Sequence, residues 1–414
     1  MARIPALLAA LWVVTALSGC AAGPRLPPPR VTDGSAVPLG FPADVRLESS
    51  DWPRMQREAP ELLARLRQAS AGGAIHILAL SGGGAGAAFG AGALVGWSHT
   101  GTRPQFEVVT GVSAGALVAP LAFLGAGWDG ELTAAFSVKA SQQLLQRQWG
   151  GMILGTSLYR GEPLRDLVER FATPRLLAAV AAESAKGRLL LVATTNLDRE
   201  STVIWNLGAI AQQGGSAARE LFCDVLVASA SVPGVFPPVL IRVQQGTHVF
   251  EELHVDGGTT DSVFIAPEIV SIAPGLFGSM SGADAYILVN GQFGSALPPT
   301  RPQTVAIVKR SILATMRGSS RADAETALLT ARQMGMRIQV SSIPDDYPFP
   351  GALDFEADSM QRLFNYGVRC GSAGRVWSTP LEALRRNSTL HVSSTGQEAV
   401  ACPATGGLMA GPSP

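Results

Sequence analysis

Short apolar runs alternate with helical patterns along most of the chain. Residues 75–80 are almost continuously apolar, which is typical of a parallel strand covered on both faces. An Ala- and Gly-rich segment then predicts a helix to about Trp97. The run "FEVVTGV" (106–112) repeats the strand pattern, and "AGALVAPLAFLGAG" (114–127) repeats the helical one. This alternation predicts an α/β fold, a three-layer α/β/α arrangement with a largely parallel central sheet.

The same alternation continues downstream. In the segment 51–68, a charged helix is expected after Pro60. The pattern predicts further helices at 217–230, at 303–335 and after about residue 354, and further strands at 187–198, 201–206, 252–258, 285–290 and 336–343.

Two long uncharged stretches permit a second interpretation. No charged residue lies between Arg67 and Arg103, or between Glu107 and Asp129, so both stretches could be taken for membrane helices. However, the first contains a glycine triplet and the second begins with "TGVSAG". Strand–turn–helix units explain these glycines, whereas a membrane helix does not, so we favour the α/β interpretation.

The N-terminus has the pattern of a secretory signal. "MARIPALLAALWVVTALSGC" places Arg3 before an apolar run that is too short to span a bilayer. Its last four residues resemble a bacterial lipobox, so we expect a signal peptide over 1–19 and a lipidated Cys20. Ala21 would favour the outer membrane, with the face left open. The alternative is an ordinary signal peptide with an incidental cysteine.

The rest of the chain divides by composition. Residues 20–70 are expected to hold the lipidated cysteine, a tether that contains "PRLPPPR", and a leading helix. One α/β domain is expected over 71–392, with its motifs within 74–290. The small-residue segment 393–414 is expected to be a flexible tail.

Composition narrows the possible partners. Of 414 residues, 47% are apolar and only 15% charged, so much of the chain should be buried. Lys+Arg and Asp+Glu both number 32, and this balance gives no reason to expect nucleic acid as a partner. The oligomeric state is left open.

The cysteines suggest no metal site and no cofactor. Cys223 lies in an expected buried helix and is interpreted as a free core thiol. Cys370 and Cys402 could form a disulfide that fixes the tail, because export permits disulfides, or they could remain unpaired.

Ser113 is the first candidate for chemistry. It lies in Gly111-Val112-Ser113-Ala114-Gly115, where a strand is expected to turn sharply into a helix. Such a turn strains the backbone of the central residue and presents its hydroxyl at the strand end. The flanking Gly111 and Gly115 would avoid collisions with neighbouring chain. A GxSxG pattern by itself is weak, and its strand–helix context strengthens it.

The triplet Gly82-Gly83-Gly84 follows the first strand and opens a helix. Its backbone amides could bind an anion. A dinucleotide fold is disfavoured, because Ala87 breaks the G-x-G-x-x-G spacing and the second strand does not end in an acidic residue. The other interpretation is an oxyanion hole beside Ser113, in which one donor contributes about 10²–10³ in rate.

A serine nucleophile needs a base. A Ser–Asp–His order along the chain would leave only His391, whose surroundings are not distinctive. Asp256 is better placed, because it ends an apolar strand and is followed by Gly257 and Gly258, which let the chain turn away. A lone "DGG" is more often a simple turn.

As a set and in this order, these motifs resemble those of the patatin-like phospholipases. Two further stretches fit, "ASASVPGVFPPV" (228–239) and "FEADSMQRLFNYG" (355–367), so the resemblance covers roughly 74–375. It implies a patatin-like fold, with Ser113 as nucleophile and Asp256 as its direct base, without histidine. It also implies that Gly82, Gly83 and Gly84 supply the oxyanion donors.

The activity that the resemblance implies is lipid acyl hydrolysis of the phospholipase A, lysophospholipase or esterase type, through an acyl-enzyme. The substrate would be a lipid or another acyl ester, no cofactor would be needed, and the N-terminal lipid would hold the enzyme at a membrane. Headgroup, acyl-chain length and the balance between hydrolysis and acyl transfer are left open.

One departure from the family pattern bears on activity. The family usually has a basic residue two positions after the triplet, followed by glycine, where this chain has Gly86 and Ala87. The loss of that charge supports one alternative, a catalytically silent lipoprotein that binds lipid or a partner. A conventional Ser-His-Asp esterase, with His391 as the base, is a separate alternative.

Overall fold

The computed structural model describes residues 25–29, 36–136, 160–265, 280–294, 299–383 and 400–404. The expected signal peptide, Cys20, His391 and most of the expected tail lie outside these ranges, and their predictions remain predictions. Within the described ranges, no helix is both long and apolar enough for a bilayer crossing.

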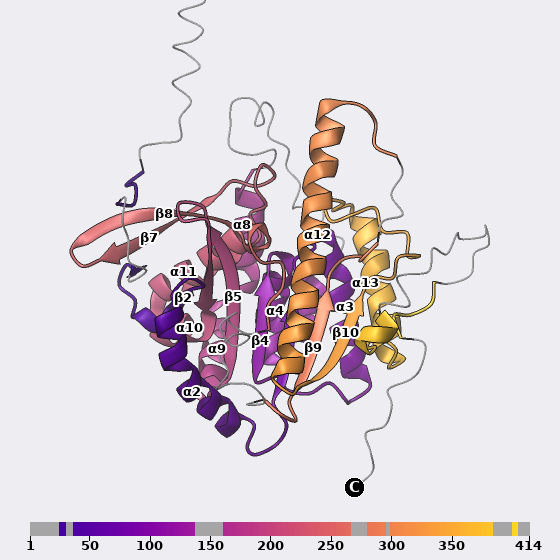
Figure 1. Cartoon of the computed structure of the whole chain (residues 1–414), viewed down its shortest axis with the longest axis horizontal. Coiled ribbons are helices and arrows are strands. Elements are labelled where there is room, and N and C mark those ends of the chain that lie inside the picture. Colours follow the sequence, from indigo (N-terminus) through magenta and orange to yellow (C-terminus); the bar gives the residue numbers. More distant parts are fainter. Residues whose placement is uncertain are drawn as a thin grey trace, which may run out of the picture.

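Ten strands form one sheet (Figure 1). Five neighbouring strands, in the order β5-β4-β3-β9-β10, are mutually parallel, and antiparallel strands extend the sheet beyond β5. The strands are β1 (Val37–Pro38), β2 (Arg46–Glu48), β3 (His76–Leu80), β4 (Val108–Val112), β5 (Leu189–Asn196), β6 (Ser201–Asn206), β7 (Val239–Gln245), β8 (His248–Asp256), β9 (Asp284–Val289) and β10 (Arg337–Ser342).

Helices cover both faces of this sheet, because its central strands are apolar on both sides. In β3, Leu78 and Leu80 belong to one buried cluster and Ile77 and Ala79 to the other. The first cluster includes residues of α3 (Ala87–His99), α4 (Ala114–Leu124), α5 (Asp129–Ala135), α8 (Glu162–Phe171), α9 (Pro174–Ala185), α10 (Leu207–Gln213), α11 (Gly215–Ser229) and α13 (Ala357–Ser372). The second includes residues of α2 (Trp52–Ala69) and α12 (Thr304–Gln333).

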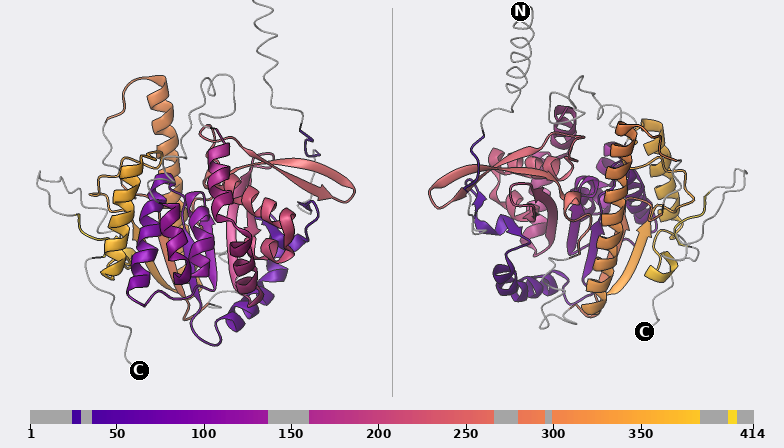
Figure 2. Two further views of the ribbon diagram at one scale, coloured as in Figure 1. Left: turned by 180° about the vertical axis from the view of Figure 1, so that it is seen from behind. Right: turned by 45° about the horizontal axis from the view of Figure 1, so that its top comes forward.

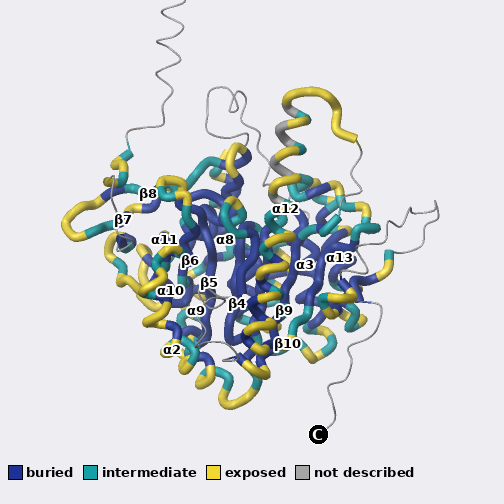
Figure 3. The backbone as a smooth tube through the Cα atoms, in the orientation of Figure 1, coloured by how far each residue is buried: buried dark blue, intermediate teal, exposed yellow. Residues whose placement is uncertain are grey.

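The predicted three-layer α/β/α class is therefore confirmed. Figure 1 shows α2 and α12 on the near face, and the view from behind in Figure 2 shows α3, α4 and α13 on the other. Buried backbone is concentrated along the central strands and α3, as Figure 3 shows.

Two details near the N-terminus differ from the sequence prediction. Helix α2 begins at Trp52 rather than after Pro60, since the Asp51 side chain accepts a hydrogen bond from Arg54 N–H and caps the helix. Pro60 lies within the helix at an exposed position, so its missing N–H does not leave an unpaired backbone group in the core.

Residues expected to belong to the tether also join the sheet. β1 pairs with β7, and β2 pairs with β6. These strands are only two and three residues long, too short to show the two-residue periodicity by which a strand is found in a sequence. The folded unit therefore begins before the expected boundary at residue 71.

Candidate active site

The strand register brings Ser113 and Asp256 together. β4 pairs in parallel with β5 up to Val112, opposite Ala193. β8 pairs antiparallel with β5 and ends at Asp256, opposite Thr194. Because β6 occupies the other edge of β5 at these positions, β4 and β8 share one edge and run toward each other. Their last residues therefore meet at the C-terminal edge of the parallel strands.

Ser113 follows directly on β4 and has the strained backbone expected of a sharp strand-to-helix turn. Its φ and ψ are 54° and −129°, in a region that side-chain-bearing residues rarely adopt. The Oγ of Ser113 donates a hydrogen bond to Asp256 Oδ2 over 2.5 Å. Both residues are buried, with 3% and 2% of their surface exposed. The structure thus holds a hydroxyl and a carboxylate in direct contact, away from bulk water.

The flanking glycines permit close approach of neighbouring backbone. An added Cβ at Gly111 would lie 2.8 Å from the carbonyl oxygen of Gly115, and at Gly115 it would lie 2.5 Å from the carbonyl oxygen of Leu80. At Gly257 it would lie 2.5 Å from Ala193 O. Gly258 N–H donates to Asp256 Oδ1 over 2.7 Å, which fixes the second carboxylate oxygen.

The setting of Asp256 makes it a stronger base than an ordinary carboxylate. Burial raises its pKa to about 7, while the hydrogen bonds from Ser113 and from the Gly258 amide act in the opposite direction. A carboxylate with a pKa near neutrality can accept a proton from a hydroxyl far more readily than one with a pKa near 4.

The three glycines of the triplet differ in whether their backbone amides already have a hydrogen-bond acceptor. Gly82 N–H already donates to the Ser262 carbonyl over 2.9 Å, so the predicted oxyanion role does not fit Gly82. Its contribution is steric: an added Cβ there would lie 3.2 Å from Ser113 Cβ. Gly83 and Gly84 have φ values of 152° and 52°, and neither amide donates to a backbone carbonyl in the described part of the chain. These two amides are available for an oxyanion.

Asn290, just after β9, holds this turn in place and explains the departure at Gly86. Asn290 N–H donates to Ser81 Oγ, and its Nδ2 donates to Ser81 O, over 2.8 and 2.7 Å. A Cβ added at Gly86 would lie 2.0 Å from the Asn290 carbonyl oxygen. The backbone arrangement therefore leaves no room for a basic side chain at position 86.

Two pockets border these turns. The first, here called the polar pocket, is lined by Gly82, Gly83, Ser113 and Asp256 together with residues of α12 and of the loops after β9 and β10. The second, here called the apolar pocket, includes Gly84 and Ala114. Most of its other lining residues are hydrophobic, among them Leu117, Leu121, Phe136, Val168, Phe171, Phe222 and Leu226.

None of the four described histidines contacts Ser113: three have other polar neighbours and one is exposed. His76 Nδ1 lies 3.3 Å from the Asp284 carboxylate, and His99 Nδ1 lies 3.1 Å from Ser372 Oγ. His248 is exposed at the start of β8. His254, although only two residues before Asp256, is held elsewhere.

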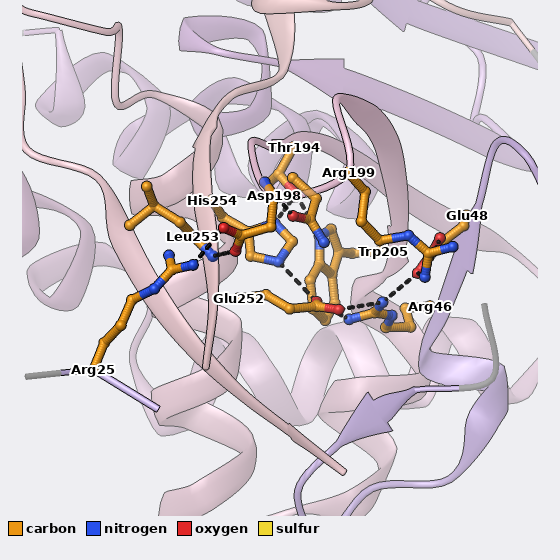
Figure 4. A network of polar contacts seen from close by, with 11 residues as sticks. Arg25, Arg46, Glu48, Thr194, Asp198, Arg199, Trp205, Glu252, Leu253 and His254 are labelled. Carbon is orange, nitrogen blue, oxygen red and sulfur yellow. Dashed lines mark hydrogen bonds and ion pairs between the residues drawn. The ribbon is translucent and has the colours of Figure 1, made fainter. Parts of the chain in front are cut away.

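His254 belongs to a buried polar network that includes Thr194, Trp205, Glu252 and Arg46 (Figure 4). Trp205 Nε1 donates to Thr194 Oγ1, which lies 2.9 Å from His254 Nδ1, and His254 Nε2 lies 3.2 Å from Glu252. Because Trp205 can only donate, the Thr194 hydroxyl can donate to Nδ1, which leaves the proton on Nε2 facing Glu252.

Arg46 completes the network and connects β2 to β8. Its guanidinium contacts Glu252 over 2.6 Å and Glu48 over 2.7 Å. Burial lowers the pKa of His254, so this histidine is neutral at physiological pH. Glu48 and Glu252 both contact Arg46, whereas Asp256 forms no ion pair within the described residues. The network therefore supports the fold of β8 rather than the chemistry at its end.

Sequence reasoning missed one residue in contact with Ser113. Ser229, at the end of α11, accepts a hydrogen bond from Ser113 N–H over 2.9 Å and donates to the Ala193 carbonyl over 2.7 Å. The only available signal was its position in the stretch "ASASVPGVFPPV".

The cysteines lie away from the site. Cys370 and Cys402 form a disulfide that holds residues 400–404 against α13, and Cys223 is a buried free thiol. Among the described residues, no group of three or more His, Cys, Asp or Glu side chains is arranged to hold a metal ion.

A hydroxyl hydrogen-bonded to a buried carboxylate, beside a turn with free amides, is the constellation of acyl-transfer sites. Residues 78–269 match the family model described as patatin-like phospholipase. The chain therefore contains a patatin-like phospholipase domain. Proteins of that family act on lipid esters, and the domain indicates lipid acyl hydrolase activity.

Other comparisons add little to this assignment. No curated protein matches the sequence. Among solved structures, VipD from Legionella pneumophila is similar at 14% identity and a TM-score of 0.30, over 70% of this chain and 67% of that one. At that score the likeness carries no weight, and the assignment rests on the family model.

Proposed function

We propose that this protein is a serine-dependent lipid acyl hydrolase that uses Ser113 and Asp256 as a two-residue catalytic device. The observation that carries the proposal is the 2.5 Å hydrogen bond between the two side chains, in a setting that raises the pKa of Asp256 to about 7. Asp256 takes the proton of Ser113 as its Oγ attacks the ester carbonyl, and gives that proton to the alcohol oxygen as the alcohol leaves. In the second step Asp256 takes a proton from water, which attacks the acyl-enzyme, and returns it to Ser113 Oγ as the fatty acid is released.

The oxyanion would be held by backbone amides rather than by a side chain. Neither Gly83 N–H nor Gly84 N–H donates to a backbone carbonyl of the described residues, and both lie on the turn beside Ser113. Glycine suits these positions because both have positive φ. This arrangement does not need the basic residue that the family usually has near the triplet, which favours an active enzyme over a silent binding protein.

The apolar pocket is the proposed acyl-chain site. Its lining begins at Gly84 and Ala114 and continues over side chains of α4, α8 and α11. A fatty acyl chain bound there would place its carbonyl carbon near Ser113. An apolar lining with polar groups only at one end is what a lipid ester requires.

A chemical probe and two variants test the proposal. A fluorophosphonate should label the wild type at Ser113, and nitrophenyl acyl esters should be cleaved. Ser113→Ala should lose both labelling and cleavage, and Asp256→Asn should lose most cleavage. Circular dichroism should show both variants folded. A wild type that neither labels nor cleaves would support the silent lipoprotein, and loss of cleavage in His391→Ala would support a Ser-His-Asp esterase.

We also propose that Cys20 is lipidated and anchors the enzyme, with Ala21 favouring the outer membrane. The motif "LSGC" supports this part of the proposal. Cys20→Ala should prevent incorporation of labelled fatty acid and release the protein from the membrane fraction. Lipid anchoring would be refuted if the wild type incorporates no labelled fatty acid and Cys20→Ala stays in the membrane fraction as the wild type does.

A further inference from the structure

One cation in the polar pocket has no role in the chemistry proposed so far. The ionisable side chains that line this pocket are Asp256, Arg317 and Arg321. Arg321 forms an ion pair with Glu325 at the exposed side of α12. Arg317 forms no direct ion pair or hydrogen bond within the described part of the chain, although it is only partly exposed.

The position of Arg317 follows from the course of α12. Ala324, Ala327 and Ala331 of this helix pack on the sheet. The same helical face, continued one and two turns toward the N-terminus, carries Ser320 and Arg317. The N-terminal part of α12 extends past the C-terminal ends of the strands (Figure 1). The face of α12 that carries alanine against the sheet therefore carries Arg317 where the helix extends beyond the sheet and borders the polar pocket.

The electrostatic surroundings do not satisfy this charge. Burial lowers the pKa of Arg317, Asp345 at longer range opposes the shift, and Arg310 adds like-charge repulsion. The guanidinium nevertheless remains protonated at neutral pH. The groups that shift the pKa of Asp256 do not include Arg317. A partly buried, unpaired cation in a pocket calls for an anionic ligand.

We propose that Arg317 binds the phosphate of a glycerophospholipid whose acyl ester lies at Ser113, so that the polar pocket receives the headgroup and the apolar pocket the acyl chain. This inference rests on the proposed function. A guanidinium suits a phosphate because its planar fork can donate two parallel hydrogen bonds. The charge that is sterically excluded at position 86 is thus supplied from α12. Arg317 is a specificity residue and takes no part in proton transfer.

A pair of matched substrates tests the proposal. Monoacylglycerol phosphate and monoacylglycerol with the same short acyl chain differ only in the phosphate, and both are used as monomers. Arg317→Gln should lower kcat/KM for the phosphate ester by about 10- to 100-fold, because a hydrogen-bonded charge is lost. Its kcat/KM for the neutral ester should fall far less, so that the preference for the phosphate ester is lost. Arg317→Lys should retain part of the preference, since it retains the charge.

Arg332→Gln is the matched control, because Arg332 is exposed on the same helix and does not line the pocket. It should behave as wild type on both esters. Equal losses on the two esters in Arg317→Gln, or no loss on either, would overturn the inference. Inorganic phosphate should inhibit neutral-ester cleavage only weakly; if it binds as tightly as the phosphate ester, the site serves free phosphate instead of a lipid headgroup.

The proposed function can fail separately. If the wild type cleaves neither ester, the hydrolase proposal is wrong, and calorimetry with monoacylglycerol phosphate still decides the inference. Wild-type binding that is lost in Arg317→Gln would sustain the phosphate site, and equal binding by both proteins would refute it.

Discussion

Two buried carboxylates on one strand, Glu252 and Asp256, have opposite electrostatic settings. They lie four residues apart on β8, so both side chains project from the same face of the strand. Burial raises the pKa of Asp256 to about 7, and no ion pair within the described residues opposes this shift. Burial acts on Glu252 too, but the His254 hydrogen bond and the Arg46 ion pair outweigh it and hold its pKa at about 2.

The difference shows that burial alone does not determine what a carboxylate does. Glu252 remains charged at every physiological pH and serves the connection between β2 and β8. Asp256 can change its charge near neutrality, which a base requires. One short strand thus carries a structural anion and a titratable one, and the contacts of Glu252 with His254 and Arg46 account for the difference.

The largest expected effect is on the rate. Asp256→Asn removes the proposed base and should lower kcat on a nitrophenyl ester by about 10²–10⁴-fold. Because Asn keeps the shape and can still accept the Gly258 amide, the fold should survive. Glu252→Gln, measured where it is still folded, should retain most of the rate. Steady-state kinetics check this, and equal rate losses in the two variants would remove the distinction between the carboxylates.

The second largest expected effect is on stability, and it belongs to Glu252 instead of Asp256. Glu252→Gln leaves Arg46 with an incomplete partner set in the core and should lower the free energy of unfolding by about 3–5 kcal/mol. Denaturant unfolding at pH 7 measures this difference. The comparison fails if Glu252→Gln is as stable as the wild type, since the buried network would then contribute nothing to the fold.

These contrasts separate what the sequence predicts from what it does not. Ser113 and the glycine triplet follow parallel strands, and parallel strands end at one edge of a sheet, so their proximity is predictable from spacing. Asp256 is different: it ends an antiparallel strand that meets β4 end to end, and only the family resemblance indicated that encounter.

The network around Arg46 illustrates a second limit. Arg46 lies in a segment with no strand periodicity, and its partner Glu252 is 206 residues away. No local pattern reports such a contact. Ser229 and Arg317 were not identified from the sequence for a similar reason. The residue pattern of a helix shows which of its faces is apolar, but it does not show which distant loops lie next to that helix.

The third prediction concerns pH. Asp256 must be deprotonated to act, so kcat/KM should rise with pH through an apparent pKa of about 7. Its effect on stability has the reverse sign. The folded-state pKa lies above the unfolded value, so the stabilisation is complete below about pH 4 and is lost as pH rises through 7.

Asp256→Asn should therefore be more stable than the wild type at pH 8, by up to about 4 kcal/mol, with the difference vanishing near pH 4. Glu252 should show the mirror image: its contribution is present above the unfolded pKa and is lost as pH falls toward 2. Unfolding curves across pH 4–8 test both signs. If Asp256→Asn is no more stable than the wild type at pH 8, the explanation that burial without a countercharge raises the pKa of Asp256 is wrong.

The smallest effect concerns a hydroxyl that touches the nucleophile from behind. Ser229 Oγ accepts the Ser113 N–H and thereby helps to hold the strained backbone at φ 54°. Ser229→Ala leaves that N–H without an acceptor, at a cost of about 1 kcal/mol, and should lower kcat by roughly fivefold. Because Ser229 positions Ser113 and does not touch substrate, KM and the apparent pKa near 7 should stay constant.

Ser231→Ala is the matched control for this last variant. Ser231 is equally buried, two residues further along, but its hydroxyl donates to the Val227 carbonyl and contacts neither Ser113 nor Asp256. Its backbone carbonyl, which accepts Asp256 N–H, is unaffected by the substitution. If both alanine variants lower kcat equally, the loss reflects general packing of the α11 end. A loss confined to Ser229→Ala would show that the rate depends on how the backbone of Ser113 is held, in addition to the charge on Asp256.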